Sequence, residues 1–209
     1  MNIFILVVLA IISYLIGSVS SAILVGKIIS GDDIRSHGSG NAGATNALRT
    51  YGKGAAALVT IGDCLKAVVC CLLAIAAAHI TPLGIENTKL AIYVAGIGAV
   101  LGHNFPVYFG FKGGKGILVS ITALMFADWR IALVVMIISI SVMVITRYVS
   151  LGSVLGAVLF IAAALIFKRG DIQYMVFAIV LALIAIYKHR TNISRLIHGT
   201  ESKVGSKKK

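Results

Sequence analysis

Apolar residues in this 209-residue chain follow one another in long runs, with neither the two-residue alternation of a strand nor the one-sided stripe of a surface helix. Such runs are typical of helices that cross a bilayer, whose hydrocarbon core is about 30 Å thick. Short links with glycine, proline or charged residues separate the runs. The pattern predicts seven spans, at 3–28, 54–80, 89–110, 116–127, 130–146, 151–167 and 172–187.

The fourth of these spans is short. Its twelve residues would make about 18 Å of helix against a hydrocarbon core of about 30 Å. This helix must therefore be tilted with extended ends, inserted halfway, or packed on protein. A count of five spans instead of seven would leave both ends of the chain on the same sides.

Composition agrees with a membrane protein. Hydrophobic residues make up 59% of the chain and charged residues 12%, and the mean hydropathy is +1.00, all far outside the averages for soluble proteins. The predicted fold class is all-α, a polytopic integral membrane protein. Because the links leave no room for a separate soluble domain, we expect one domain over 1–209. The first apolar run has no positive n-region and continues to Ile29, so we expect a retained span and not a cleaved signal.

The basic residues predict the orientation of the chain. With the N-terminus outside, fourteen of the 19 Lys and Arg residues fall on the inner side and four on the outer side, as the positive-inside rule requires. The inner ones are Lys27, Arg35, Arg49, Lys53, Lys112, Lys115, Arg147, Lys188, Arg190, Arg195, Lys203, Lys207, Lys208 and Lys209. The outer ones are Lys89, Arg130, Lys168 and Arg169, and Lys66 lies within a span. The C-terminus is then cytoplasmic, and most of the net charge of +12 faces anionic lipid head groups and metabolites, so nucleic acid is not needed to explain it.

A polar, glycine-rich segment at 36–49 is the first candidate for function. It contains no acidic residue, and Gly38, Gly40 and Gly43 let the backbone come close to a ligand and point several N–H groups the same way. Hydrogen-bonding side chains and one charge accompany the glycines: Ser39, Asn41, Thr45, Asn46 and Arg49. The segment predicts anion binding, with phosphate the best match. The alternative is a flexible link between helices.

The same glycines match the dinucleotide-binding fingerprint, and Asp63 stands at the spacing of the ribose-binding acid. That fingerprint follows a buried strand and opens a soluble βαβ unit. Here no such strand precedes the glycines, and Asp63 lies inside an apolar run bound for the bilayer. The context therefore excludes a Rossmann site.

A second candidate lies within 102–116, where two lysines bracket two glycines: Lys112, Gly113, Gly114 and Lys115. The spacing is one residue short of a P-loop, and Gly116 stands where the magnesium-binding hydroxyl belongs, so an NTPase is not favoured. Two ammonium groups, backbone N–H donors and the N-terminus of the next helix still favour phosphate. The alternative is a pair of lysines that snorkel at the membrane edge. The nearby His103 and Asn104 stay unassigned.

The third candidate is the segment 187–201, where the last span meets the cytoplasm. If it is helical, His189, Asn192 and Arg195 recur every three residues and share one face. They would then form a row of hydrogen-bond donors. Snorkelling basic residues are again the alternative.

Two further groups have structural interpretations. Asp63 and Lys66 stand at i and i+3 within the second span, so we expect them to pair and thereby to lower the cost of burying charge. Cys64, Cys70 and Cys71 share that span without a metal-ligand pattern, and we expect buried thiols that act as small hydrophobes.

Three anion-binding elements at the cytoplasmic surface suit a reaction between a phosphorylated metabolite and a lipid-like donor. The His-x4-Asp device of many glycerolipid acyltransferases is absent, because no histidine is followed at the fifth position by Asp. No cysteine lies in the candidate loops to form an acyl-enzyme, and no acidic cluster is available for a catalytic metal. A transporter of organic phosphates is the opposing hypothesis. It would place its charges near the bilayer midplane and show inverted repeats, whereas here they gather at one face.

The three elements together resemble the motifs of the bacterial acyl-phosphate:glycerol-3-phosphate acyltransferases, the PlsY family. The matching residues are Gly-Ser-Gly-Asn-Ala-Gly-Ala-Thr-Asn at 38–46 with Arg49, Gly102-His103 leading to Phe-Gly-Phe-Lys-Gly-Gly-Lys-Gly at 109–116, and His189-Arg-x-Asn-Ile-x-Arg-Leu with Gly199 and Glu201. Motif order, spacing and the seven-span layout agree over nearly the whole chain. The resemblance implies transfer of an acyl group from acyl phosphate to the sn-1 hydroxyl of glycerol 3-phosphate, which gives lysophosphatidic acid and inorganic phosphate.

The resemblance also implies roles for single residues. It places five around glycerol 3-phosphate and the reacting phosphate: Ser39, Arg49, Lys115, His189 and Asn192. It makes Gly113, Gly114 and Gly116 shape the pocket, Ser153 a contact on the acyl-phosphate side, and Glu201 structural. It implies no cofactor. The implied partners are glycerol 3-phosphate, long-chain acyl phosphate, the lipid bilayer and the soluble enzyme that makes acyl phosphate, and the implied location is the bacterial plasma (inner) membrane with the active site facing the cytoplasm.

Overall fold

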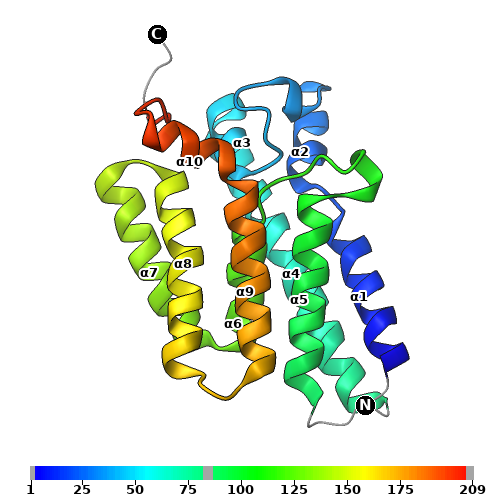
Figure 1. Ribbon diagram of the computed structural model, residues 1–209. Coiled ribbons are helices and arrows are strands. Elements are labelled where there is room, and N and C mark those ends of the chain that lie inside the picture. The colour runs from blue at the N-terminus through cyan, green and yellow to red at the C-terminus, as the bar shows by residue number, and fades with distance from the viewer. Residues whose placement is uncertain (1–2, 82–86, 206–209) are drawn as a thin grey trace. The chain divides into compact units, whose positions relative to one another are not determined.

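A computed structural model describes residues 3–81 and 87–205, and every regular element within these ranges is helical (Figure 1). The α-helices are α1 (Ile3–Gly17), α2 (Ser21–Ser30), α3 (Ala44–Tyr51), α4 (Lys53–Ile80), α5 (Thr88–Asn104), α6 (Ile117–Ala127), α7 (Trp129–Thr146), α8 (Val149–Phe167), α9 (Ile172–Lys188) and α10 (Arg190–Ile197). Two short 3₁₀ helices are η1 (Ile34–Ser36) and η3 (Val107–Phe109). The predicted all-α membrane architecture is confirmed. Most of the expected outer link at 81–88 and the tail lysines Lys207, Lys208 and Lys209 lie outside the described residues.

The length and apolarity of the helices can be compared with the predicted spans. Among the described residues, five helical segments are long and apolar enough to cross a membrane, at 3–30, 53–80, 88–109, 129–146 and 149–167. The pair α9 and α10, bent by 61° at their junction, would supply a sixth. The short helix α6 has 11 residues and packs against α4 and α5, which is one of the three arrangements expected for it. The count of seven spans stays a prediction.

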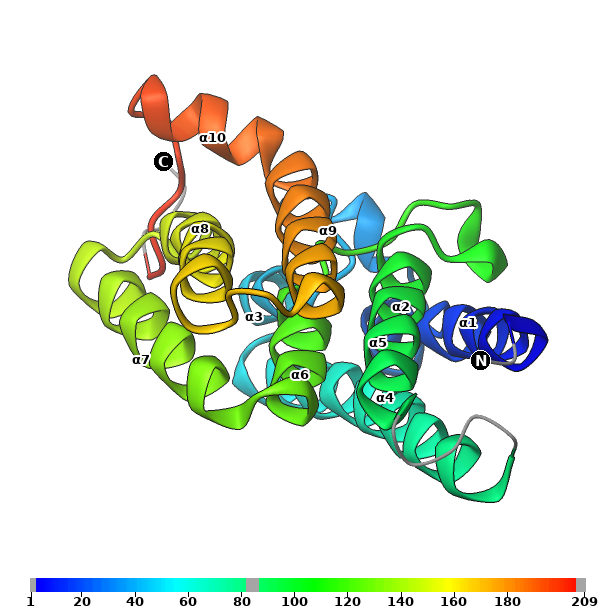
Figure 2. The same ribbon diagram turned by 60° about the horizontal axis from the view of Figure 1, so that its bottom comes forward.

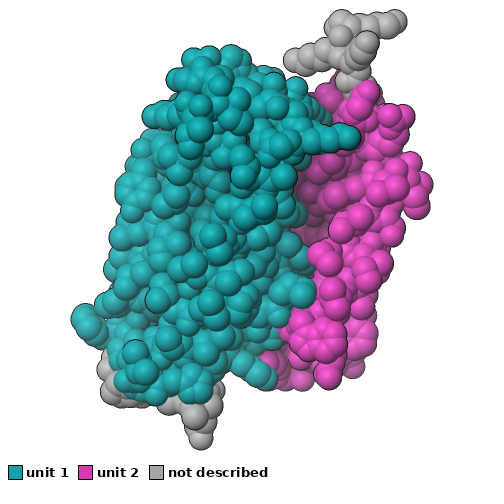
Figure 3. Space-filling view, turned by 180° about the vertical axis from the view of Figure 1, so that it is seen from behind, with its two compact units in different colours: residues 1–127 teal, residues 128–209 magenta. Residues whose placement is uncertain are grey.

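The chain forms two compact units, residues 1–127 and residues 128–209 (Figure 3). The first holds α1 to α6 and the second α7 to α10.

Within the first unit, α1 and α5 lie side by side (Figures 1 and 2). Glycines on α5 make this close approach possible: a Cβ at Gly102 would lie 2.1 Å from the Tyr14 carbonyl oxygen, and one at Gly98 would lie 2.8 Å from that of Ala10. Small residues four apart are a common device for packing membrane helices. The Tyr14 hydroxyl then donates a 2.8 Å hydrogen bond to the Phe105 carbonyl at the end of α5.

The first predicted span, 3–28, lies within one candidate membrane segment at 3–30, but this segment is broken into two helices. The α1 helix ends at Gly17, and α2 begins at Ser21 after Ser20, whose side-chain oxygen accepts a hydrogen bond from the Ile23 N–H as an N-cap. A Cβ at Gly17 would lie 2.3 Å from the Ala99 carbonyl oxygen. The small residues that end α1 therefore serve contact with α5. The break also takes Val19 out of regular helix, so its carbonyl can accept a hydrogen bond from a side chain.

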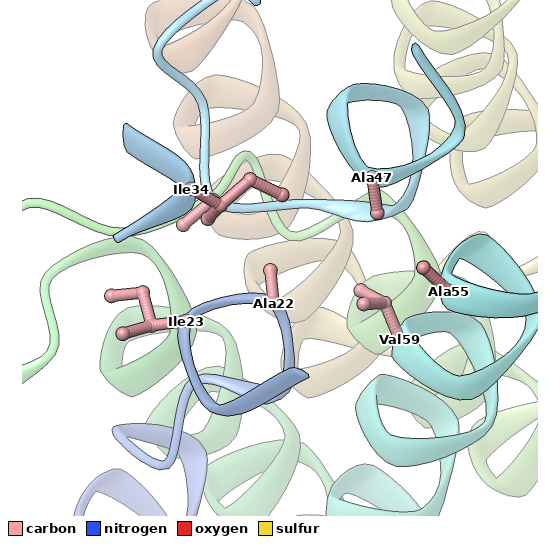
Figure 4. Close-up of a cluster of buried hydrophobic side chains, with 7 residues drawn as sticks. Ala22, Ile23, Ile34, Ala47, Ala55 and Val59 are labelled. Carbon is pink, nitrogen blue, oxygen red and sulfur yellow. The ribbon is translucent and has the colours of Figure 1, made fainter. Parts of the chain in front are cut away.

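A cluster of buried apolar side chains lies under the polar segment 36–49 (Figure 4). Its members are Ala22 and Ile23 of α2, Ile34 of η1, Ala42, Ala47 of α3, and Ala55 and Val59 of α4. Phe109 of η3 packs against the same cluster. Apolar burial thus fixes the polar segment to the helices below it.

In the second unit, α8 packs against both α7 and α9 (Figures 1 and 2). Gly152 of α8 lies so close to α7 that a Cβ would be 2.5 Å from the Ser139 carbonyl oxygen. On the other side, Phe160 of α8 meets Tyr174 and Phe177 of α9 edge to face, with ring centroids 5.8 Å apart in both pairs. These contacts hold α8 in place between its neighbours.

Candidate functional site

The segment 36–49 is shaped by Asn46. This side chain is 1% exposed. Its Oδ1 accepts from the Ser39 backbone N–H at 2.8 Å, and its Nδ2 donates to the carbonyls of His37 at 3.0 Å and Ile34 at 3.2 Å. Gly38 has a φ of +60°, and a Cβ there would lie 2.2 Å from Asn46 Oδ1. Asn46 and Gly38 therefore shape the backbone of the segment, and the substrate contact expected of them stays a prediction.

Ser39 and Arg49, the two residues of this segment implied in catalysis, are both exposed. Arg49 lies in the last turn of α3. The helix begins after Gly43, which has no side chain to accept from the first-turn N–H groups. The N-cap residue of α3 therefore leaves the first-turn N–H groups without a side-chain acceptor of its own. The half-buried Asn41 and Thr45 lie on either side of Gly43 in the sequence. This arrangement suits an anion.

The segment 102–116 closes the C-terminus of α5. The Gly114 N–H donates to the His103 carbonyl at 3.1 Å, and the Gly113 N–H donates to the Asn104 carbonyl at 3.3 Å. The last carbonyls of α5 thus find partners in this segment. Lys115 is half-buried and follows directly, and Lys112 is exposed.

Arg35 joins the two segments, a role that sequence alone did not suggest. Its Nη1 donates to the carbonyls of Phe109 at 2.7 Å and Lys112 at 2.9 Å. Its Nε and Nη2 bind the Asp33 carboxylate, with Nη2 2.7 Å from Oδ2. The hydrogen bonds from Arg35 lower the pKa of Asp33 below its usual value, so the pair stays ionised at neutral pH. Gly114 provides a second junction, because a Cβ there would lie 2.6 Å from the Ala42 carbonyl oxygen.

Buried charge lies next to this junction. Lys66 Nζ is 3.0 Å from Asp63 Oδ1 and 2.8 Å from His103 Nδ1. The i, i+3 spacing had suggested the pairing of Asp63 and Lys66, but nothing in it indicated His103.

The third candidate segment lies in the second unit, at the bend between α9 and α10. His189 occupies the bend itself, is 3% exposed, and donates from Nδ1 to the Ala185 carbonyl at 2.8 Å. Asn192 is 7% exposed in the first turn of α10. Arg195, expected on the same face, is exposed. The bend thus buries two of the three side chains in the row.

Asn192 is held by Glu201. Glu201 Oε1 accepts hydrogen bonds from Asn192 Nδ2 at 2.8 Å and from Ser150 Oγ at 3.0 Å. The residues beyond Glu201 contact the turn between α7 and α8, where the Val204 N–H donates to the Arg147 carbonyl at 2.9 Å. Residues 201–205 therefore form a strap that ties α10 to the start of α8. Sequence reasoning did not find Ser150.

Ser153, the implied contact on the acyl-phosphate side, lies one turn after Ser150 on α8 and is 4% exposed. Its hydroxyl donates to the Val149 carbonyl at 2.9 Å, as serines in apolar helices commonly do. Its contact with substrate stays a prediction.

Known proteins resemble this chain over nearly its full length. Residues 7–199 match the family described as Glycerol-3-phosphate acyltransferase. The chain is 44% identical over 214 residues to the glycerol-3-phosphate acyltransferase of Clostridioides difficile (strain 630), with 100% of each covered. It is 45% identical over 205 residues to the protein of that name from Shouchella clausii (strain KSM-K16), with 97% of each covered.

Solved structures agree. The chain is 34% identical to PlsY (YgiH), an integral membrane glycerol 3-phosphate acyltransferase, in the crystal structure of its glycerol 3-phosphate form, with a TM-score of 0.83 and 96% of each chain covered. The lysophosphatidic acid form of PlsY gives a TM-score of 0.79 at 32% identity, covering 96% of this chain and 95% of that one. On this sequence and fold similarity, the chain belongs to the glycerol-3-phosphate acyltransferase (PlsY) family of integral membrane proteins.

Proposed function

We propose that this glycerol-3-phosphate acyltransferase takes its acyl group from a long-chain acyl phosphate and transfers it to the sn-1 hydroxyl of glycerol 3-phosphate. One observation carries the proposal. Arg35 binds the carbonyls of Phe109 and Lys112 from its place beside the segment 36–49, and so holds two glycine-rich, acid-free segments together. Two neighbouring segments of this kind can bind two phosphate groups, one on each substrate. A relative solved in a glycerol 3-phosphate form supports the acceptor.

The reaction needs little covalent chemistry from the protein. The sn-1 hydroxyl oxygen bonds to the carbonyl carbon of the mixed anhydride, and the bond from that carbon to the phosphate oxygen breaks. Inorganic phosphate leaves, and the hydroxyl proton passes to a phosphate oxygen. The donor is already activated, so alignment and stabilisation of negative charge are the main demands on the protein.

We assign roles on that basis. Arg49 and Lys115 bind phosphate oxygens, for which guanidinium and ammonium groups are well suited. Ser39 donates a hydrogen bond beside them. His189 and Asn192 orient the reacting groups, and Glu201 keeps Asn192 in place through its 2.8 Å hydrogen bond.

The choice of donor is tested with the purified protein in detergent. With glycerol 3-phosphate and palmitoyl phosphate, we expect inorganic phosphate and lysophosphatidic acid in equal amounts, with the acyl group at sn-1 by NMR. Palmitoyl-CoA should give no product. Turnover with palmitoyl-CoA and none with palmitoyl phosphate would contradict the proposal.

We further propose that the chain lies in the bacterial inner membrane with the segments 36–49 and 102–116 facing the cytoplasm. The excess of basic residues on that side supports this orientation. Single cysteines at the exposed positions Ser36 and Arg169 test it, in a background without the native cysteines. An impermeant thiol reagent should label Ser36→Cys only in inverted vesicles and Arg169→Cys only in intact cells. The reverse pattern would overturn the orientation.

A further inference from the structure

Asp63 and Lys66 of α4 and His103 of α5 form a buried cluster in the first unit. Their exposed fractions are 2%, 6% and 7%. Lys66 Nζ lies 3.0 Å from Asp63 Oδ1 and 2.8 Å from His103 Nδ1, and Nδ1 lies 3.5 Å from the same carboxylate oxygen. Charges within a membrane span are costly. A buried ion pair also rarely adds more stability than apolar side chains of the same volume would. The cluster therefore calls for a reason beyond stability.

The contacts of Lys66 fix the protonation of His103. An ammonium group has three N–H donors, and Lys66 directs them at the Val19 carbonyl at 3.0 Å, the Asp63 carboxylate and His103 Nδ1. The Val19 carbonyl can accept because it lies in the break between α1 and α2, outside regular helix. The Asp63 carboxylate, 3.0 Å away, favours the charged ammonium form of Lys66, which has no lone pair with which to accept. His103 Nδ1 must therefore accept, which leaves the ring proton on Nε2.

The other edge of the imidazole faces the junction of the two phosphate-binding segments. A Cβ at Gly114 would lie 2.1 Å from His103 Nε2 and 2.6 Å from the Ala42 carbonyl oxygen. The ring edge thus occupies the space that a side chain at Gly114 would fill, beside the backbone of the segment 36–49. The main chain of His103 meets Gly114 as well, through the 3.1 Å hydrogen bond to its carbonyl.

We propose that Asp63 and Lys66 hold His103 as the Nε2–H tautomer, and that His103 is a positioning residue that sets how the segments 36–49 and 102–116 meet. The inference rests on the proposed function, because those segments are taken to bind the phosphate groups. His103 acts through their backbone and not on the reacting atoms. Loss of its Nε2–H donor should therefore weaken binding of glycerol 3-phosphate more than it slows turnover.

Two amide substitutions separate this role from simple burial. The amide of asparagine replaces the Nδ1 edge of histidine, and that of glutamine reaches the Nε2 position. We expect His103→Gln to keep KM for glycerol 3-phosphate within about threefold of the native value, and His103→Asn to raise it about tenfold or more, on the scale of one lost hydrogen bond. If His103 served only to accept from Lys66 through Nδ1, His103→Asn would keep KM near the native value and His103→Gln would raise it.

A matched control comes from Cys70, which is buried on α4 one turn beyond Lys66 and contacts Ser13 instead. Cys70→Ala should leave KM for glycerol 3-phosphate unchanged even where it lowers thermal stability. A rise in KM that follows melting temperature across all three variants would overturn the proposal.

The tautomer is measured without any substrate, on the unsubstituted protein. In ¹⁵N-histidine-labelled protein in lipid nanodiscs, the signal that disappears in His103→Asn belongs to His103. We expect its Nε2 to carry a proton and its Nδ1 to carry none, and we expect this state to be lost in Asp63→Asn/Lys66→Met, which removes both charges together. A protonated Nδ1 in the native protein would sink the inference. This measurement uses no substrate, so it tests the tautomer of His103 even if the proposed acyl donor is wrong. A failure of the inference can therefore be told apart from a failure of the proposed function.

Discussion

Replacing Arg49 or Lys115 with alanine is expected to lower kcat/KM by about 10²–10³-fold, the effect of removing a donor that meets developing negative charge. Arg49 is exposed in the last turn of α3, and Lys115 is half-buried just before α6. Neither belongs to the apolar core, so both variants should keep the native fold in detergent. Arg49→Lys should recover only part of the activity, because an ammonium cannot bind phosphate through two parallel hydrogen bonds. Steady-state kinetics with varied glycerol 3-phosphate measure each effect.

Lys53→Ala supplies the control for net charge. Lys53 is exposed at the start of α4, four residues after Arg49, and has no proposed part in binding. It should therefore retain near-native kinetics. An equal loss of activity in Lys53→Ala would show that general basic charge is responsible, and near-native Arg49→Ala and Lys115→Ala would remove both residues from the site.

Gly113→Ala is expected to lower the free energy of unfolding by about 1–3 kcal/mol, the usual cost of forcing extra volume into a packed interior. The added methyl would lie 2.1 Å from the His103 carbonyl oxygen and 2.6 Å from Pro106 Cδ. Backbone must move to relieve the first contact, and the hydrogen bond from the Gly114 N–H to the same carbonyl would be strained. Activity should fall together with stability. Thermal unfolding in detergent and kinetics on the surviving folded protein measure the two effects.

Gly54→Ala is the matched control, because a Cβ at this helical position meets nothing within 4 Å. It should be neutral or stabilising by about 0.5–1 kcal/mol, the difference in helix propensity between the two residues. Sequence alone had suggested that Gly113, Gly114 and Gly116 let the backbone wrap an anion. The geometry adds a packing cause, since the side chain or backbone of His103 or Asn104 fills the space beside each one. A stable Gly113→Ala with only KM raised would restore the first interpretation.

Sequence predicted the helices well because the signal for a membrane helix is local. Apolar runs gave most of the long helices to within a few residues, but α5 ends at Asn104 instead of 110, and the short helix α3 lies in a polar segment that no run covers. The breaks within the runs were not predicted either. The run 3–28 is interrupted at 18–20 by contact with α5, and the last span bends at His189. Both features depend on what the helix packs against, and neither appears in the hydropathy of the run itself.

The candidate segments also followed from local composition, but the residues that organise them did not. Arg35 bonds to a carbonyl 74 positions away, Lys66 to a side chain 37 away, and Ser150 to one 51 away. No motif spacing indicates such partners. Asn46 shows the converse limit, because its polar side chain in a candidate ligand-binding segment bonds to the backbone of that segment and of the preceding η1 helix. A polar residue type alone does not tell a ligand contact from a scaffold.

The strap at 201–205 has a consequence for biosynthesis. Asn192 and Ser150 share Glu201 Oε1, yet Glu201 is translated after all of α7, α8 and α9. Asn192 therefore lacks that partner until α7, α8 and α9 have all been synthesised. The second unit therefore acquires its helices first and the bracing of α10 afterwards, when the strap reaches the turn at Arg147. The bracing of α10 is thus among the last contacts that synthesis of the chain makes possible.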